Sequence, residues 1–222
     1  MEGGGEVFLP ALTLEERDAL RGPGMVRSYP RGAALFHERQ TADRVLVLLQ
    51  GCVKLSCLSD AGKEVVLAIR GPGDLLGELA AIDGEPRSAT ATALEPVTAM
   101  SIPASDFQRF LERHPRVALT LLKVVTRRLR DADRKRVEFA SEDSMTRVAG
   151  RIVELSERFG DEVAQGLEID LPISQEELAG WTGCSRDSVV NALQAMRGLG
   201  WIETHRRRIV VRDIDALRRH AG

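Results

Sequence analysis

One short stretch restricts the fold more than any other, because three of its positions each meet a separate geometric demand. In ISQEELAGWTGCSRDSVVNALQAM, Ala179 lies four residues, Gly183 eight residues and Val189 fourteen residues after Gln175. Two helices joined by a tight turn need a small residue where they cross, a turn residue that tolerates positive φ, and an apolar residue that holds the second helix to the core. The spacing predicts a helix-turn-helix.

The ends of these helices carry signals of their own. Ser174 can cap the first helix, with Glu177 completing a capping box, and Ser185 can cap the second helix. Gly198 lies where the second helix would end. Upstream, TRVAGRIVELSERFG predicts an amphipathic helix that ends at Gly160, and a polar loop would join it to the motif.

The second helix of this motif would present polar side chains near its N-terminus, of the types that reach phosphates and base edges in a DNA major groove. The segment WIETHRRRIVVRD then predicts a β-hairpin with a basic tip, which has the shape of a wing. Two helices of any small α domain are the alternative, and the basic hairpin favours double-stranded DNA as a partner. The candidate DNA-binding residues are Ser174, Gln175, Ser185, Arg186, Asp187, Ser188, Asn191, His205, Arg206 and Arg207.

A long helix is predicted ahead of this motif, since residues 116–140 contain neither glycine nor proline. A row of positions repeats along it at alternating spacings of four and three: Ala118, Leu122, Val125, Leu129, Ala132, Arg136 and Phe139. This row is a coiled-coil seam broken once, at Arg136. A surface helix packed on its own domain is the alternative. The helix is longer than one small domain needs, so we expect a homodimer through it.

The sequence pattern from about Met25 to Ile102 is typical of β-strands. Its apolar or alternating runs are VLVLLQG, VKLSCLS, EVVLAI, ATATAL and VTAMSI, with turn clusters such as SDAGK and DGEPR between them. Strands at this regular spacing predict an antiparallel sandwich or jelly roll. A short helix, FQRFLER, would follow, capped by Ser105 or Asp106 and interrupted at His114.

The positions of the cysteines and histidines and the lack of long apolar segments argue against several classes of protein. Cys52, Cys57 and Cys184 are odd in number and far apart, which argues against a disulfide framework or a cysteine metal site. The four histidines are isolated, which argues against a cupin-type metalloenzyme. No window approaches the roughly 18 apolar residues of a membrane span, and the N-terminus lacks a basic start followed by an apolar run. We expect a cytoplasmic protein that is not an enzyme and has no metal or membrane partner.

The stretch GELAAIDGEPRSATA, residues 77–91, completes a larger pattern. GDLLGEL and RSA in a jelly-roll region, a long helix, and GCSRDSV followed by a hairpin resemble the Crp/Fnr family of bacterial transcription regulators. The resemblance implies a non-enzymatic DNA-binding regulator, with RNA polymerase as a further partner. It also implies an α+β architecture with an effector-binding jelly roll over residues 1–114, a central dimerisation helix over 115–141 and a winged helix-turn-helix domain over 142–222.

The same resemblance assigns roles in ligand binding. The backbone N–H groups of Gly77, Glu78 and Leu79 would face a phosphate, Arg87 would bind its oxygens, and the Glu78 carboxylate would accept from a ribose 2′-hydroxyl. Ala132 would stand where the family's cyclic AMP receptors hold adenine with polar side chains, and an alanine side chain cannot do this. The candidate ligand-binding residues are Gly77, Glu78, Leu79, Ala80, Arg87, Ser88, Ala89, Ala132 and Asp133.

The implied effector is a cyclic nucleotide, with cyclic AMP first. The alternative is a degenerate pocket in the same fold that takes another small molecule or needs none. In the second helix of the DNA-binding motif, the resemblance gives Arg186 a bidentate guanine contact, Asp187 the place of a Glu that accepts from cytosine, and Asn191 the place of a basic base contact.

Overall fold

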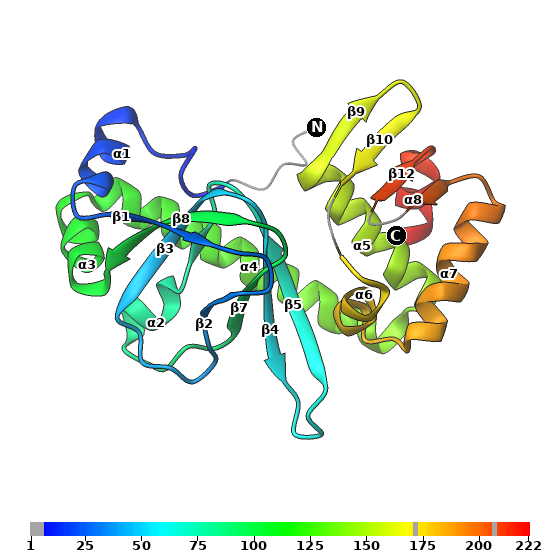
Figure 1. Ribbon diagram of the computed structural model, residues 1–222, viewed down its shortest axis with the longest axis horizontal. Helices are drawn as coiled ribbons and strands as arrows, with labels where there is room; N and C mark the ends of the chain where they lie inside the picture. Colours follow the sequence, from blue (N-terminus) through cyan, green and yellow to red (C-terminus); the bar gives the residue numbers. More distant parts are fainter. Residues whose placement is uncertain (1–6, 171–172, 206–207) are drawn as a thin grey trace. The chain divides into compact units, whose positions relative to one another are not determined.

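The computed structural model describes residues 7–170, 173–205 and 208–222 (Figure 1). The chain divides into two compact units. Among the described residues, one unit contains residues 7–58 together with Leu67–Arg130, and the other contains Ser59–Val66 together with Asp131–Gly222. Within the described residues, no helix is both long enough and apolar enough to cross a membrane.

The N-terminal part of the chain forms the predicted β-sandwich of two four-stranded sheets. One sheet has the order β1-β8-β3-β6, made of Met25–Tyr29, Val97–Pro103, Arg44–Gln50 and Leu75–Leu76. The other has the order β2-β7-β4-β5, made of Ala34–Phe36, Thr90–Ala93, Val53–Leu58 and Glu64–Arg70. All five predicted strand runs are confirmed, and the shorter strands β1, β2 and β6 add to them.

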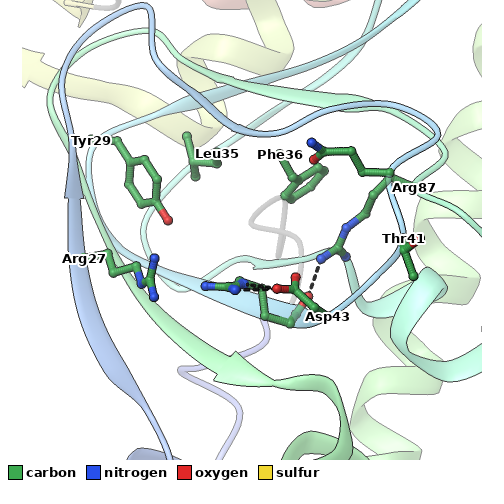
Figure 2. A pocket seen from close by; sticks show the side chains of 9 residues that line it. Arg27, Tyr29, Leu35, Phe36, Thr41, Asp43 and Arg87 are labelled. Atoms are coloured by element: carbon green, nitrogen blue, oxygen red, sulfur yellow. Dashed lines mark hydrogen bonds and ion pairs between the residues drawn. The ribbon is translucent and has the colours of Figure 1, made fainter.

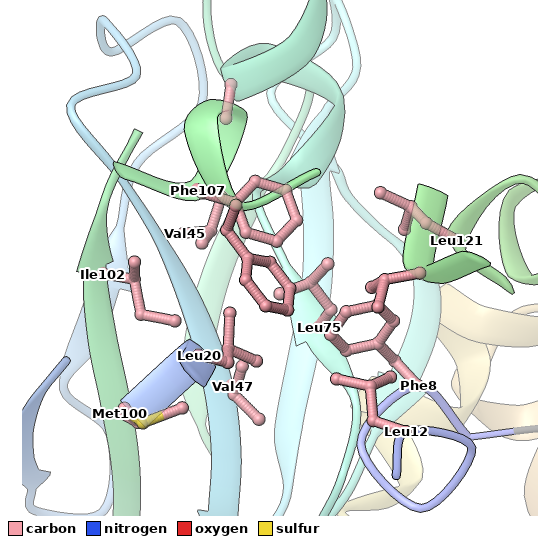
Figure 3. Close-up of a cluster of buried hydrophobic side chains, with 13 residues drawn as sticks. Phe8, Leu12, Leu20, Val45, Val47, Leu75, Met100, Ile102, Phe107 and Leu121 are labelled. Atoms are coloured by element: carbon pink, nitrogen blue, oxygen red, sulfur yellow. The ribbon is translucent and has the colours of Figure 1, made fainter. Parts of the chain in front are cut away.

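Strand β3 shows why its sequence is continuously apolar instead of alternating. Val45 and Val47 pack into one core cluster, whereas Leu46 and Leu48 pack into another. Successive side chains of a strand point to opposite faces, so both faces of this sheet are covered. In Figure 3, Val45 lies beside Phe107 of helix α3 (Ala104–Arg113), and Val47 lies beside Leu20.

Two helices follow the sandwich in the chain, and the cap predicted for the first of them is wrong. Helix α3 begins at Ala104, with Pro103 as its N-cap and no side-chain cap, so Ser105 lies inside the helix. The predicted interruption at His114 is confirmed. The predicted long helix is confirmed as α4 (Pro115–Ser141).

Helix α1 (Leu14–Arg21) is held to α4 by an ion pair that responds to pH. Glu16 is buried, and Arg116 Nε donates to its Oε1 at 2.7 Å. This hydrogen bond from Arg116 lowers the pKa of Glu16 from 4.5 to about 2. Because the pKa is lower in the folded state, the ion pair contributes its full stability above the unfolded pKa and loses it as pH falls through the folded pKa.

We therefore expect Glu16→Gln to destabilise the protein at neutral pH and to lose this effect in acid. Urea unfolding of the wild type and the variant at a series of pH values would measure it: the difference in free energy of unfolding should shrink between about pH 5 and pH 2. Glu112→Gln, on an exposed site of α3, is the control. A difference that stays constant with pH would contradict the ion-pair role.

The C-terminal elements build a winged helix-turn-helix around a small sheet of order β11-β12-β10-β9. They are α5 (Ser144–Phe159), β9 (Gly160–Val163), β10 (Gly166–Ile169), α6 (Gln175–Thr182), α7 (Arg186–Gly198), β11 (Ile202–His205), β12 (Arg208–Val211) and α8 (Ile214–Ala221). Helix α5 ends before Gly160 as predicted. A Cβ on Gly160 would overlap the Ser156 carbonyl oxygen, which explains the glycine without a left-handed backbone.

The polar loop predicted after α5 is wrong over residues 160–169, because β9 and β10 form a hairpin there. Strand β10 also pairs with β12, from Leu167↔Val211 to Ile169↔Ile209. The wing strands therefore belong to a four-stranded sheet. Charged residues such as Asp161 and Glu162 lie on the edge strand β9, where they remain exposed.

Candidate ligand and nucleic-acid sites

Arg87 is the most deeply buried cation of the candidate ligand site, with 3% of its surface exposed. Its Nη1 donates to the Gly77 carbonyl oxygen at 2.8 Å, and its Nη2 donates to the Arg44 carbonyl oxygen (Figure 2). The guanidinium carbon lies 4.5 Å from the centre of the Phe36 ring. Two carbonyl dipoles and an aromatic face thus surround the charge.

No carboxylate among the described residues forms an ion pair with Arg87. Burial lowers the pKa of Arg87, and Asp43 and Glu78 oppose this through longer-range attraction. The Arg87 Nε is buried and has no hydrogen-bond partner in the described part of the chain. A buried cation is normally paired with an anion, because desolvation of an unpaired charge is costly. This site therefore has the electrostatics of an anion-binding site.

Gly77 is needed for this arrangement. It precedes helix α2 (Glu78–Asp83) with a φ of 75°, in the left-handed region where glycine is favoured. A Cβ at this position would overlap Arg87 Nη1. The missing side chain of Gly77 therefore makes room for the Arg87 guanidinium.

The other predicted cassette residues differ in exposure. Leu79 is 44% exposed and Ser88 is also exposed, whereas Ala80 and Ala89 are buried. Ala132 and Asp133 are exposed on α4 and belong to the other unit. The structure brings Gly77 and Arg87 together, and the assignment of Ala132 and Asp133 to the ligand stays a prediction.

The carboxylate of Glu78 already has a partner that sequence reasoning missed. Glu78 is buried, and its Oε1 accepts from Arg128 Nη1 of α4 at 2.7 Å. Arg128 Nη2 also donates to the Leu75 carbonyl oxygen at 3.0 Å and lies 3.4 Å from Asp74 Oδ1. A ribose hydroxyl at Glu78 would have to share this carboxylate with Arg128.

The sequence contained a signal for Arg128. The buried face of α4 includes Val117, Leu121 and Val124, and Arg128 continues this row at the same alternating spacing. A basic residue on an apolar helix face needs a buried carboxylate or carbonyl to contact. The spacing alone does not say which acid that is.

The helix-turn-helix has the predicted geometry. Ser174 accepts from the Glu177 N–H and forms the capping box, and Ser185 accepts from the Ser188 N–H. Gly183 has a φ of 64° in the turn. Val189 of α7 is fully buried. These features present the N-terminal end of α7 to solvent.

The predicted DNA-contacting side chains lie mostly on the surface. Arg186, Asp187 and Asn191 are exposed on α7, and no residue in the described part of the chain pairs with Arg186. The half-buried Ser188 contacts the Ser185 hydroxyl at 2.9 Å, so its hydroxyl takes part in the cap. Ser174 and Gln175 are exposed at the start of α6, and His205 is exposed at the end of β11. Arg206 and Arg207 lie outside the described residues.

Comparison with known proteins identifies relatives of both halves. Residues 26–114 match the family "Cyclic nucleotide-binding domain", and residues 146–220 match the "Crp-like helix-turn-helix domain". The chain is 32% identical over 193 residues to the CRP-like cAMP-activated global transcriptional regulator of Mycobacterium tuberculosis, covering 87% of this chain and 86% of that protein.

Two further likenesses extend over most of the chain. It is 30% identical over 209 residues to the cyclic AMP receptor protein of Thermus thermophilus, covering 94% of each chain. Among solved structures, FixK2 from Bradyrhizobium japonicum has a TM-score of 0.80 at 22% identity, covering 90% of this chain and 98% of that chain. The sequence relatives show the family of the chain, and the solved structure shares its fold.

Proposed function

Because the chain belongs to the Crp/Fnr family of DNA-binding transcription regulators, we propose that it acts as a homodimer controlled by a cyclic nucleotide bound beside Arg87. The observation that carries the proposal is the buried Arg87 guanidinium, which has no carboxylate partner among the described residues and touches Gly77. The phosphate of a cyclic nucleotide would supply the missing anion. As a DNA-binding regulator it would act in the cytoplasm, with RNA polymerase as an expected partner.

Cyclic AMP is the first candidate, since the two sequence relatives are named as cAMP-activated and as a cyclic AMP receptor. Two features of this chain favour a second candidate, a regulator of the same fold with another effector or none. The Glu78 carboxylate is held by Arg128, and Ala132 offers no polar side chain to a base. Both features would weaken contacts to the sugar and the base of a nucleotide, and neither would weaken the contact to its phosphate.

The deciding experiment is calorimetric titration of the full chain with cyclic AMP and with cyclic GMP. Selection of DNA sequences with and without the tighter-binding nucleotide would follow. Binding of either nucleotide together with stronger DNA selection supports the proposal. Absence of binding to both, with DNA selection retained, would replace it by the second candidate.

The homodimer would use an exposed apolar row on α4. Leu119, Leu122 and Leu129 are 61%, 60% and 61% exposed. Val125 of the predicted seam instead packs partly against the sandwich core. Leu122 and Leu129 therefore stay in the predicted seam, and Leu119 adds to it. Apolar residues at these spacings on a long helix favour pairing with the same helix of a second copy.

We expect Leu122→Glu to convert the dimer to a monomer. The exposed leucine contributes little to the fold of one chain, whereas two glutamates at the seam would repel each other and would be desolvated. Analytical ultracentrifugation at micromolar concentration would measure the mass. Lys123→Glu, at the next exposed position, is the control. An unchanged dimer of the Leu122 variant would place the interface elsewhere.

Arg186 is expected to read one base pair. Arg186→Ala should cost about 1 to 3 kcal/mol at a single base position and relax the preference there, because a bidentate contact to guanine is lost. Binding to a library of single-base operator variants would show this. Arg219→Ala, an exposed arginine of α8, is the control. A uniform loss across all sequences would assign Arg186 to the phosphate backbone.

A further inference from the structure

A cavity in the sandwich is lined by Arg87 and by residues of β1, β2 and the start of β3, and by no residue of α2. The cavity has a volume of about 290 Å³. Figure 2 shows side chains from β1, from β2 and from the segment before β3 around a common hollow. The residues that matter for its chemistry are Arg27, Tyr29, Phe36, Asp43, Arg44 and Arg87.

The lining carries an excess of positive charge. Its charged side chains are three arginines and one carboxylate. Arg44 Nε donates to Asp43 Oδ2 at 2.9 Å, so these two charges compensate each other, and this hydrogen bond lowers the pKa of Asp43. Arg27 and Arg87 remain. Arg27 is exposed and has no hydrogen bond or ion pair with any residue that the structure describes. An anion is therefore the complementary occupant.

The rest of the wall combines the polar residues Gln40 and Thr41 with apolar and aromatic side chains. Tyr29, Leu35 and Phe36 pack with their inner sides against the core between the sheets. In Figure 2 the Tyr29 hydroxyl points into the hollow, and the Phe36 ring lies across from Tyr29. A flat apolar group could pack on these rings, because stacked or edge-to-face rings attract each other. A bare inorganic anion would leave this surface unused.

The volume limits the size of the occupant. An apolar cavity of about 150 Å³ holds benzene, and pockets for drug-sized ligands start at about 300 Å³. A volume of about 290 Å³ therefore fits one substituted ring. We propose that this cavity binds a small aromatic carboxylate, with its ring between Tyr29 and Phe36 and its carboxylate at Arg27 in the positive field of Arg87. This site shares Arg87 with the phosphate contact proposed at Gly77, but its other lining residues lie outside α2.

Benzoate is the probe, titrated into the full chain by calorimetry. Benzamide, which has the same shape without the charge, and acetate, which has the charge without the ring, are the comparison ligands. We expect benzoate to bind more tightly than both. Equal binding of benzamide would overturn the role of charge, and equal binding of acetate would overturn the role of the ring.

Variants then locate the site. Arg27→Gln should weaken benzoate binding about tenfold to a hundredfold, as expected for the loss of one charge-assisted hydrogen bond. Arg27→Lys should recover part of the loss, and Arg113→Gln, an exposed arginine of α3, should have no effect. An unchanged affinity of Arg27→Gln would overturn the proposal.

Amide shifts in heteronuclear NMR separate this site from the cyclic-nucleotide site. Benzoate should shift the amides of Arg27, Tyr29 and Phe36 more than those of Gly77 and Leu79. The opposite pattern would place benzoate at α2 and overturn the inference. Because none of these measurements uses a nucleotide, failure of the nucleotide proposal would leave the result for this cavity readable.

Discussion

Arg87→Leu is expected to lose cyclic-nucleotide binding while it keeps the fold. The variant lacks the guanidinium that would hold the phosphate, and each hydrogen bond to a charged group contributes about 1.5 to 3 kcal/mol. Loss of two such bonds corresponds to at least about a hundredfold weaker binding. Calorimetry would measure the affinity, and a DNA-binding assay with and without nucleotide would measure the response.

The fold should survive because two effects of the substitution oppose each other. The carbonyl oxygens of Gly77 and Arg44 lose a donor, which is destabilising, whereas removal of a buried charge without an ion-pair partner is stabilising. Near-ultraviolet circular dichroism and urea unfolding would test this. Arg113→Leu is the control on an exposed site. If Arg87→Leu bound nucleotide and DNA as the wild type does, the phosphate role of Arg87 would be wrong.

Gly77→Ala tests the same contact from the other side. An alanine Cβ would collide with Arg87 Nη1 in a backbone region that side chains rarely adopt. Arg87 would have to move, even though its own side chain is intact. A variant that folds and has weakened nucleotide binding would show that the position of the guanidinium matters as well as its charge.

The helix-turn-helix could be predicted almost completely because its signals are local. Ser174, Glu177 and Ser185 act on N–H groups within three residues, and the backbone conformation of Gly183 depends on its own missing side chain. The strands were also predictable. An apolar run is continuous where both faces of the sheet are covered, and it alternates with polar residues where only one face is covered.

The errors arose where partners far apart in the chain decide the structure. Strands β9 and β10 are short and pair with each other. Strand β10 also pairs with β12 about forty residues later, as in Leu167↔Val211, and this long-range pairing places both strands in the sheet. Arg128 was missed as a partner of Glu78 because the two residues are 50 positions apart, and the assignment of Glu78 to a ribose stays a prediction. Helix α4 has apolar residues on two faces, and spacing alone did not show that Val125 would pack partly on the core while Leu119 stayed exposed.

The second large effect on stability is expected at a cluster of charged side chains around Arg151, next to the helix-turn-helix. Arg151 of α5 is 4% exposed, its Nη1 donates to Glu154 Oε2 at 2.9 Å, and its Nη2 donates to Glu138 of α4. Its guanidinium carbon lies 5.8 Å from the centre of the buried Trp181 ring of α6. Arg151 therefore contacts side chains of three helices.

Arg151→Ala is expected to destabilise the protein by roughly 3 kcal/mol, because its hydrogen bonds to Glu138 and Glu154 are lost and each hydrogen bond to a charged group contributes about 1.5 to 3 kcal/mol. Glu154 keeps its ion pair with Lys135 at 3.2 Å. Although burial raises the pKa of Glu154, attraction by Lys135 and Arg151 lowers it overall. The charged carboxylate is therefore favoured in the folded state, and its contribution is lost as pH falls below the unfolded pKa. The free energy of unfolding of the variant should therefore fall less than that of the wild type as pH falls below the unfolded pKa of Glu154.

The double variant Arg151→Met with Glu138→Gln separates charge from packing, because it removes the cation together with one of its two acceptors. If removal of the cation beside the two carboxylates causes the loss of stability, this double variant should be more stable than Arg151→Ala in urea unfolding. Equal stability of the two variants would show that lost packing on Trp181, rather than charge, dominates. Trp181 is buried in α6, and α7 follows directly after the turn that ends α6. In either case, the DNA affinity of the folded variants would therefore show whether the position of the helix-turn-helix depends on the contact between Arg151 and Trp181.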